Sequence, residues 1–555
     1  MYVESLHSGG HRIFNRLRAT DSIPQNIYLL KKVPNKCYGP SRAARWSLAP
    51  RISLPITHAF RCFAVLVSGL IFSSLSQAQE QTPKVTIHWD QVTRVSRTTP
   101  TLQVVVNPPL RRATSVHDNA FHALRDLQAD YVRYVPWLPY PKLGVAELEP
   151  PGDGKTSWDF SLIDPMTIDF LEATKGHTVI LNFSTIPQWM FKTDVPVSYP
   201  TDPDQVSWSY EKGHELRDLS FEEVADYYAR LLAWYTQGGF TDEFGKRHTS
   251  GHHYSIPFWE VLNEPDIEHQ ISPELYTRIY DAVVSAMRKV QPKMKFVGAA
   301  LAYPSGNPRF FEYFLDHKNH KADIPVDFIS YHFYAVPTPD QSADVQQHTF
   351  FAQAEGFLNV VRYIESIRQR LSPETGTMIN EIGAISTDDL GQDQPGHVVK
   401  PIPDSYWNLT GAMYAYIFAE LSRMGIEMAG ESQLVGYPTQ FPSVSMVEWE
   451  TGKPNARYWV LKLLRDNFGP GDKLMETHVA NPCAYALGVL TRDGKRRVLL
   501  INKRNRQLEL SIPGVTNGQG EYVDVTTAFQ PPSSLRMTGD KVTLGGFAVA
   551  ALKLP

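Results

Sequence analysis

The sequence predicts an α/β fold: a (β/α)8 TIM barrel followed by a C-terminal β-sandwich domain. Short strand-like runs alternate with amphipathic helical patterns eight times over residues 101–466, which is within the size range of such a barrel. After Gly469-Pro470-Gly471 the pattern changes to short strands with a hairpin turn at Asp493-Gly494, which is typical of a β-sandwich. An open doubly wound sheet is the alternative for the first domain, but no Gly-rich phosphate loop follows its first strand.

The predicted barrel strands are short runs rich in β-branched, aromatic and small apolar residues. They cover residues 102–106, 131–135, 178–183, 256–262, 296–300, 326–333, 377–381 and 427–431. Each is followed by apolar residues at three- and four-residue spacing, which predicts helices at 117–127, 161–171, 220–235, 272–290, 309–317, 354–371, 411–423 and 455–464. Ser161, Ser220 and Ser272 are predicted to cap three of these helices at their N-termini.

The β-sandwich is predicted within residues 471–555 from strands at 484–491, 497–502, 522–525 and 541–552. An extended segment at residues 84–100, before the barrel, could join it as a further strand. The expected role of this domain is structural support of the barrel. Carbohydrate binding is the alternative, although no row of aromatic residues distinguishes the domain.

Residues 1–78 form a leader whose composition differs from the rest of the chain. Cys62 to Phe72 is an apolar stretch of 11 residues that follows Arg61 and precedes Ser76-Gln77-Ala78, a small-x-small cleavage pattern. This stretch is much shorter than the ~20 residues needed to span a bilayer. The leader therefore predicts a secretory signal peptide and a secreted or periplasmic protein, with no stable membrane insertion after signal removal.

Charge and cysteine content limit the partners of the mature chain. The leader carries ten Lys and Arg against Glu4 and Asp21, so the remaining residues have a net charge of −12. An acidic surface argues against nucleic acid as a partner and suits neutral glycans better. Cys483 would be the one cysteine left after cleavage, and the adjacent His252 and His253 lack metal-ligand spacing. We expect no disulfide, no metal and no cofactor.

Two glutamates carry the strongest chemical signal. Glu264 follows the fourth predicted strand within Asn263-Glu264-Pro265, and Glu381 ends the seventh strand 117 residues later. Strand ends from distant repeats meet at one mouth only if the barrel closes. Hydrolysis of a glycosidic bond needs such a pair, because one carboxyl must donate a proton while the other stays ionised. Each glutamate taken alone is more often a solvated loop charge.

Several segments resemble glycoside hydrolase family 39, a retaining clan A family of β-xylosidases and α-L-iduronidases. Residues 258–265 (FWEVLNEP) resemble that family's acid/base strand. Further similar segments follow in the same order and lie at residues 131–133 (YVR), 158–164 (WDFSLID) and 327–334 (DFISYHFY). The resemblance covers roughly residues 100–465 and implies a TIM-barrel glycosidase with two catalytic glutamates.

Carried over by position, the resemblance makes Glu264 the acid/base and Glu381 the nucleophile. It implies that Asn263 donates a hydrogen bond to the sugar 2-hydroxyl, and that Arg133 holds Glu381 ionised. The resemblance also places the substrate-binding residues His332 and Tyr334 beside the nucleophile. The chain departs from the family at Leu262 and at Ile382-Gly383, where the family often has tryptophan.

Further candidates for substrate contact are aromatic or follow the eighth strand. Trp137, Trp189, Trp407 and Trp449 could stack on a sugar, although each is more often a core residue. Glu431 and Gln433 lie where substrate contacts are expected after the last strand.

The expected function is a retaining exo-glycosidase that removes terminal sugars from oligo- or polysaccharides by double displacement. An endo-acting glycanase on the same scaffold is one alternative. The other is a non-catalytic glycan-binding barrel protein, because a fold does not guarantee chemistry.

Overall fold

The computed structural model describes residues 82–555 except for 196–197, 209–212, 340 and 393–395. The predicted signal peptide within residues 1–78 lies outside the described residues and stays a prediction. The described chain from Thr82 to Pro555 is one compact unit.

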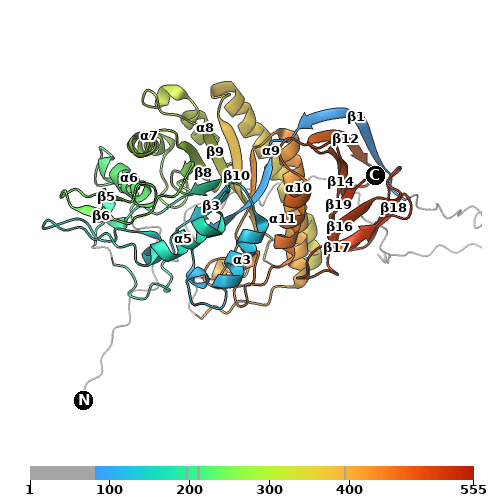
Figure 1. The fold of residues 1–555 in the computed structure, drawn as a ribbon, viewed down its shortest axis with the longest axis horizontal. Coiled ribbons are helices and arrows are strands. Elements are labelled where there is room, and N and C mark those ends of the chain that lie inside the picture. Colours follow the sequence, from blue (N-terminus) through green and yellow to red (C-terminus); the bar gives the residue numbers. More distant parts are fainter. Residues whose placement is uncertain (1–81, 196–197, 209–212, 340, 393–395) are drawn as a thin grey trace, which may run out of the picture. The chain divides into compact units, whose positions relative to one another are not determined.

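A closed parallel barrel forms the first part of this unit and confirms the predicted fold class (Figure 1). Its strands follow one another around the barrel in chain order, and the last pairs with the first. They are β2 (Thr99–Val105), β3 (Val132–Val135), β4 (Val179–Leu181), β7 (Phe258–Glu260), β8 (Lys295–Leu301), β9 (Phe328–Ala335), β10 (Gly376–Ala384) and β11 (Met428–Glu431). The carboxyl ends of these strands therefore meet at one mouth, where barrel active sites lie.

Amphipathic helices surround the barrel and bury their apolar faces against it (Figure 1). The longer ones are α3 (His117–Leu127), α5 (Ile163–Ala173), α6 (Glu222–Thr236), α7 (Pro273–Val290), α8 (Pro308–Phe314), α9 (Ala343–Leu371), α10 (Asp404–Met424) and α11 (Ala456–Asn467). Short elements in the connections are η3 (Pro108–Leu110), α4 (Pro141–Gly144), η4 (Gln188–Met190), β5 (Gly239–Thr241), β6 (Arg247–Thr249), η5 (His317–Asn319), η6 (Asp389–Gly391) and η7 (Pro442–Val444).

Of the three serines predicted to be N-caps, one was right and two were wrong. Ser272 caps α7, with its side chain accepting a hydrogen bond from the Leu275 amide at 3.3 Å. Neither Ser161 nor Ser220 is an N-cap, because α5 and α6 each begin two residues later, at Ile163 and Glu222. Helix α9 begins at Ala343, well before the predicted residue 354. The prediction missed this start because the first turns of the helix are mostly polar and lack the apolar spacing.

The C-terminal part contains a seven-stranded antiparallel sheet and a two-stranded sheet. The strands of the large sheet, in spatial order, are β1 (Val85–Val95), β12 (Lys473–Val479), β13 (Ala484–Leu490), β14 (Arg496–Asn502), β19 (Val549–Lys553), β16 (Gln519–Val523) and β17 (Ser533–Arg536). The small sheet pairs β15 (Leu508–Ser511) with β18 (Lys541–Leu544), and both sheets contribute to one hydrophobic cluster. The segment before the barrel supplies β1, which pairs with β12 at the edge of the large sheet.

Helices α10 and α11 lie between the barrel strands and this sheet (Figure 1). Leu499 and Ile501 of β14 and Val549 of β19 belong to the same buried cluster as the barrel residues. Lys503, just after β14, places its ammonium 4.1 Å from the ring centre of Tyr416 in α10. The sheet is thus part of a core shared with the barrel, which fits the expected supporting role.

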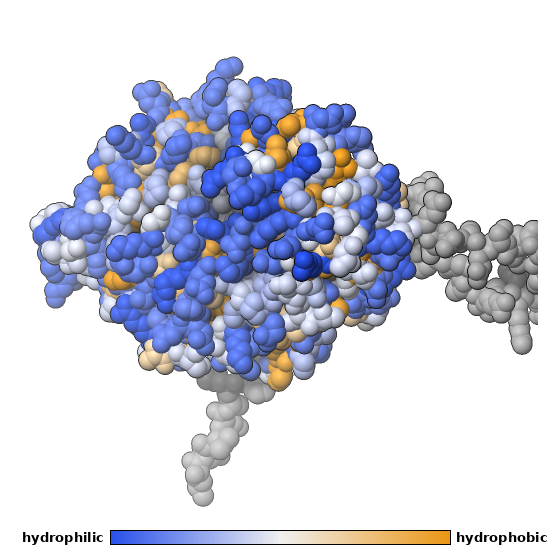
Figure 2. All heavy atoms as spheres, turned by 45° about the vertical axis from the view of Figure 1, so that its right-hand side comes forward, coloured by the Kyte–Doolittle hydropathy of each residue, from blue (hydrophilic) through white to orange (hydrophobic). Residues whose placement is uncertain are grey.

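Two features of the described chain bear on what the protein can contact: the distribution of hydrophobic residues on its surface and the composition of its helices. On the face drawn in Figure 2, hydrophobic residues form small groups among hydrophilic ones. None of the helices in the described part of the chain combines the length and apolar composition that crossing a bilayer requires.

Candidate active site

A tight turn after β7 presents Glu264 at the mouth of the barrel. Leu262 and Glu264 both have left-handed backbone conformations, with φ of 63° and 41°. The amide of Glu264 donates a hydrogen bond to the carbonyl of Ala300, at the end of β8, over 3.0 Å. Left-handed backbone at a non-glycine residue costs about 1–3 kcal/mol and is commonly found at functional sites. The strained turn therefore fixes the Glu264 carboxyl relative to the next strand.

Glu381 comes from the middle of β10, and its neighbours come from the adjacent strand β9. Glu381 pairs with His332 across the two strands, just after a register shift that follows Ile379. Tyr334 lies two residues beyond His332 on β9 and therefore faces the same side. All three side chains are buried or nearly so. Strand pairing thus brings together three residues that the sequence singled out.

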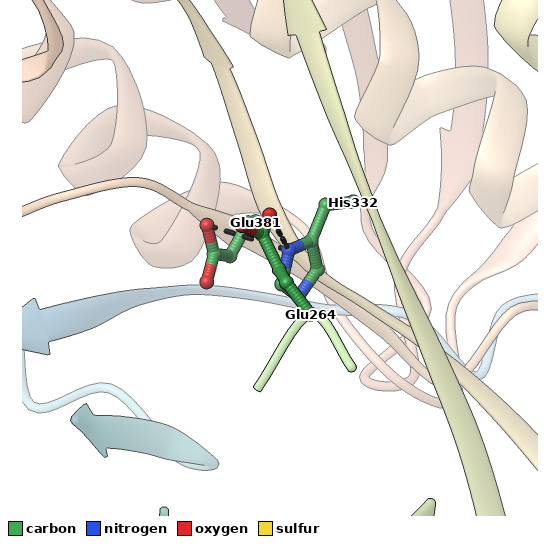
Figure 3. Close-up of side chains that lie close together, drawn as sticks. All are labelled: Glu264, His332 and Glu381. Atoms are coloured by element: carbon green, nitrogen blue, oxygen red, sulfur yellow. Dashed lines mark hydrogen bonds and ion pairs between the residues drawn. The ribbon is translucent and has the colours of Figure 1, made fainter. Parts of the chain in front are cut away.

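His332 lies between the two catalytic candidates (Figure 3). Its Nδ1 is 2.7 Å from an oxygen of Glu264 and 3.5 Å from an oxygen of Glu381. The two carboxyl groups approach so closely that one oxygen of each lies within 4.8 Å of the other. The sequence therefore predicted a pair that is spatially real, although 117 residues separate its members.

The two carboxyl groups have opposite electrostatic environments. Burial raises the pKa of Glu264 above its ordinary value, and the hydrogen bond from His332 only partly opposes this. Burial also acts on Glu381, but the positive charges of His332 and Arg133 outweigh it and lower the pKa of this carboxyl. Burial opposes the charged form of His332, yet the two carboxylates raise its pKa. One glutamate is poised to hold a proton while the other is ionised.

A ring of hydrogen bonds fixes the ionised Glu381. Its Oε1 accepts from Arg133 at 2.5 Å and its Oε2 accepts from the Tyr334 hydroxyl at 2.6 Å. Tyr334 also lies 2.7 Å from the hydroxyl of Ser432, which accepts from Gln103 at 2.6 Å. Arg133 donates to the oxygen of Gln103 and closes the ring. The predicted role of Arg133 beside Glu381 agrees with this contact.

Glu260, the third residue of the strand motif at residues 258–265, is a buried partner of Arg133 that the sequence analysis missed. Its carboxylate accepts hydrogen bonds from Arg133 and Ser330, both at 2.5 Å, and from Asn182 and Asn380, both at 2.6 Å. Arg133 therefore shares its charge between Glu260 and Glu381. The signal for Glu260 was its position in the apolar run before Asn263, where a charge needs a buried partner.

Asn263 and Trp137 meet at a second unpredicted carboxyl, Glu268. Oε1 of Glu268 accepts from Trp137 at 2.6 Å and from the amide nitrogen of Asn263 at 2.8 Å. The amide oxygen of Asn263 accepts from Arg133 at 2.6 Å. Burial raises the pKa of Glu268 well above its ordinary value, and the charge of Glu264 adds to this. Nothing in the spacing of Glu268 distinguished it from an ordinary helical-turn residue.

Glu264, His332 and Glu381 are also the residues among those described whose nitrogen and oxygen atoms lie close enough to surround a metal ion. Carboxylate and imidazole are ligand types that several divalent metals accept. In this structure Nδ1 of His332 contacts both carboxyl groups. The arrangement is what acid/base chemistry between two carboxyl groups needs.

Comparison with known families gives the class of enzyme. Residues 240–383 match the family model described as Glycosyl hydrolases family 39. The matched segment contains Glu264, His332, Tyr334 and Glu381. The protein is a glycoside hydrolase. The predicted resemblance to family 39 is confirmed for this segment, and the hydrolase acts on carbohydrate.

Solved structures of other glycoside hydrolases share the fold. A GH51 arabinofuranosidase from Xanthomonas axonopodis pv. citri aligns with a TM-score of 0.60 at 12% identity, over 85% of this chain and 100% of its own. The catalytic domain of GH30 xylanase C from Talaromyces cellulolyticus aligns with a TM-score of 0.54 at 10% identity, with the same coverage. An alpha-L-arabinofuranosidase from Thermotoga maritima aligns with a TM-score of 0.54 at 14% identity, over 85% of this chain and 100% of its own. No curated protein matches the hydrolase by sequence.

The expectation that Glu431 contacts substrate is wrong. Its side chain is fully buried, and one oxygen accepts from Arg457 of α11 at 2.8 Å. Because successive strand residues point to opposite faces, this position of β11 faces the helix layer of the hydrolase. Gln433 is also buried, and its amide donates to the carbonyl of Gln440 at 3.2 Å. Both residues hold the segment after β11 in place.

The four tryptophans have different surroundings. Trp137 is brought to the site through Glu268. Trp189 and Trp407 are buried in the main core, so their alternative interpretation as core residues is right. The indole of Trp189 donates to the carbonyl of Glu147. Trp449 is half-buried and packs against the same core.

Proposed function

We propose that this glycoside hydrolase is a retaining enzyme in which Glu381 is the nucleophile and Glu264 the acid/base. The observation that carries the proposal is the close approach of the two carboxyl groups, with oxygens within 4.8 Å. Retaining enzymes place these groups about 5–5.5 Å apart, whereas inverting enzymes leave about 6.5–9.5 Å for a water molecule. The opposite pKa shifts of Glu264 and Glu381 support the same division of roles.

In the first step Glu381 attacks the anomeric carbon while Glu264 transfers its proton to the departing oxygen. Arg133 and Tyr334 keep Glu381 ionised and oriented before the attack. In the second step the ionised Glu264 removes a proton from water, which attacks the glycosyl ester and releases the sugar. His332 keeps its Nδ1 beside the Glu264 carboxyl, at 2.7 Å, and so stabilises this carboxyl when it becomes ionised between the two steps.

We further propose exo action on terminal sugars. The side chain of Glu264 is 13% exposed and that of Glu381 is 8% exposed, which is compatible with a recessed site that holds the end of a sugar chain. Structural neighbours named as arabinofuranosidases and as a xylanase have the same fold, so the fold alone does not choose between exo and endo action. An endo-acting glycanase would lower the viscosity of a polysaccharide before it releases much terminal sugar.

The direct test is the stereochemistry of hydrolysis by the full chain. A panel of 4-nitrophenyl xylosides, arabinofuranosides, glucosides and iduronides identifies the sugar, and nuclear magnetic resonance follows the first anomer released. Retention is expected, and an inverted first product would contradict the proposal. Glu381→Ala should lose activity and form an inverted glycosyl azide when azide is added, whereas Glu264→Ala should form the retained azide.

Glu147→Gln is the matched control for these variants, because Glu147 is a buried glutamate whose neighbours lie outside the catalytic cluster. It should keep the activity of the wild type. The alternative of a non-catalytic glycan-binding protein predicts glycan binding with no turnover of any sugar, and binding that Glu381→Ala leaves unchanged.

For localisation we propose that the protein is secreted or periplasmic. The support is the apolar stretch from Cys62 to Phe72 and the cleavage pattern after it. N-terminal sequencing of the mature protein tests this proposal. A start at Gln79 is expected, and an intact leader on protein inside the cell would contradict it.

A further inference from the structure

Glu268 is a buried carboxyl beside the catalytic pair that the proposed two-step reaction does not use. It lies one helical turn after Glu264, and its amide donates to the Glu264 carbonyl at 2.9 Å. The residue is 3% exposed. A buried carboxyl costs stability unless its partners compensate for lost hydration, so its partners indicate its role.

Those partners fix the orientation of the Asn263 amide. Arg133 can only donate hydrogen bonds, so the amide oxygen of Asn263 must face it. Oε1 of Glu268 accepts a hydrogen bond, so the amide nitrogen must face Glu268. A flipped amide would place two donors together at Arg133, which has no acceptor to offer. The two buried contacts therefore select one orientation and occupy one of the two amide hydrogens.

The same oxygen of Glu268 also accepts from the indole of Trp137, at 2.6 Å. Burial raises the pKa of Glu268 well above its ordinary value, which favours the neutral form of this carboxyl. A neutral carboxyl accepts both hydrogen bonds without adding a negative charge near Glu264. It can thus orient Asn263 without disturbing the acid/base.

We propose that Glu268 is a positioning residue, which aims the remaining amide hydrogen of Asn263 at the sugar and so sets the preference for substrates with a free 2-hydroxyl. The inference rests on the proposed retaining mechanism and on the role that the resemblance to family 39 implies for Asn263, donation to that hydroxyl. Hydrogen bonds to the 2-hydroxyl strengthen in the transition state of glycoside hydrolysis. An amide that rotates freely would lose this selective stabilisation.

The experiment compares two substrates in each variant: the aryl glycoside that the full-length enzyme cleaves and its 2-deoxy analogue. In Glu268→Met, kcat/KM for the 2-hydroxy substrate should fall about 10- to 100-fold relative to the 2-deoxy substrate. We call kcat/KM for the 2-hydroxy substrate divided by kcat/KM for the 2-deoxy substrate the substrate ratio. Glu268→Gln keeps an oxygen acceptor at the same place, so this ratio should stay within about threefold of the wild-type value. Adding Asn263→Ala to Glu268→Met should lower the ratio no further than Asn263→Ala alone.

Glu147→Met is the matched control, because it removes a second buried carboxyl with a raised pKa whose contacts lie outside the site. Its ratio should equal that of the wild type even if its stability falls. Equal losses on both substrates in Glu268→Met, or a tenfold lower ratio in Glu268→Gln, would overturn the positioning role. If Glu268→Met does not fold, the Glu268→Gln result decides.

These outcomes are separate from a failure of the retaining mechanism. If Glu264→Ala and Glu381→Ala behave as the mechanism requires while the Glu268→Met ratio is unchanged, only the inference about Glu268 is wrong. If the wild type releases an inverted sugar, the mechanism itself is wrong.

Discussion

The guanidinium of Arg133 lies 2.5 Å from Glu381, and neither side chain is exposed by more than 8%. The same guanidinium contacts Glu260, which is fully buried. One cation thus compensates two carboxylates inside the barrel, and the nucleophile candidate is one of them. Buried ion pairs of this kind are expensive to break, because the remaining partner keeps its charge without hydration.

Replacing Arg133 should therefore destabilise the protein strongly. Arg133→Met should lower the free energy of unfolding by about 3–5 kcal/mol, because Glu260 and Glu381 lose their shared cation. Arg112→Met is the matched control, since Arg112 pairs with Asp169 in a more exposed position and should change stability by about 0–1 kcal/mol. Urea denaturation of both variants measures the difference. Equal small effects would mean that the buried pair is not what stabilises the site.

Tyr334→Phe should move the acid limb of the pH profile of kcat/KM to higher pH. The Tyr334 hydroxyl donates to Glu381 and helps to lower the pKa of that carboxyl, although His332 and Arg133 contribute more. Removing the donor raises this pKa, so Glu381 becomes protonated, and activity is lost, at less acidic pH. A profile measured on an aryl glycoside checks the shift. An acid limb that is unchanged or moves to lower pH would contradict the assigned nucleophile.

Glu431→Gln should affect stability more than catalysis. Its carboxylate pairs with Arg457 in the helix layer, so the substitution leaves a buried cation without its counter-charge. We expect a loss of about 3 kcal/mol in unfolding free energy, while kcat/KM at a temperature where the variant is folded stays within about threefold of the wild type. Thermal denaturation and the aryl glycoside assay measure the two effects. A loss of more than 100-fold in kcat/KM with unchanged stability would restore Glu431 as a substrate contact.

Glu147 should make the protein less stable as the pH rises. Burial raises the pKa of its carboxyl to about 8 in the folded protein, against 4.5 for an ordinary solvent-exposed glutamate. A raised folded pKa gives stability that is fully present below the unfolded pKa and is lost as pH rises through the folded pKa. Glu147→Gln should therefore remove about 3 kcal/mol of the stability difference between pH 5 and pH 8. The exposed Glu149→Gln is the control, and urea denaturation at both pH values is the measurement.

Local patterns in the sequence were sufficient for the architecture. Strand-like runs and helical spacing repeat along the chain at short range, so the barrel and its order of elements could be predicted from them. Helix ends were less predictable. The start of α9 was missed because polar first turns carry no apolar period. Two predicted capping serines were wrong: Asp218 accepts from the Glu223 amide in the first turn of α6, and α5 begins at Ile163 without a side-chain cap.

The proximity of Glu264 and Glu381 was predictable because a barrel brings the carboxyl ends of its strands together. Glu264 follows the end of β7, and Glu381 lies three residues before the end of β10. Glu431 also ends a strand, yet it faces outward. Only the alternation of side chains about β11 decides this, and a one-residue difference in register reverses it. Position along a strand is therefore enough to propose a site residue but not to assign its direction.

The sequence by itself determined the order of strands and helices, the glutamate pair and the family resemblance. The tertiary structure alone decided how charge is shared around that pair. Glu260 accepts a hydrogen bond from Arg133, which lies 127 residues before it in the chain. Glu268 accepts from Asn263, and Asn263 in turn accepts from Arg133, 130 residues before it. The protonation of a buried carboxyl is set by the atoms that replace its water, and distant parts of the chain supply those atoms only after folding.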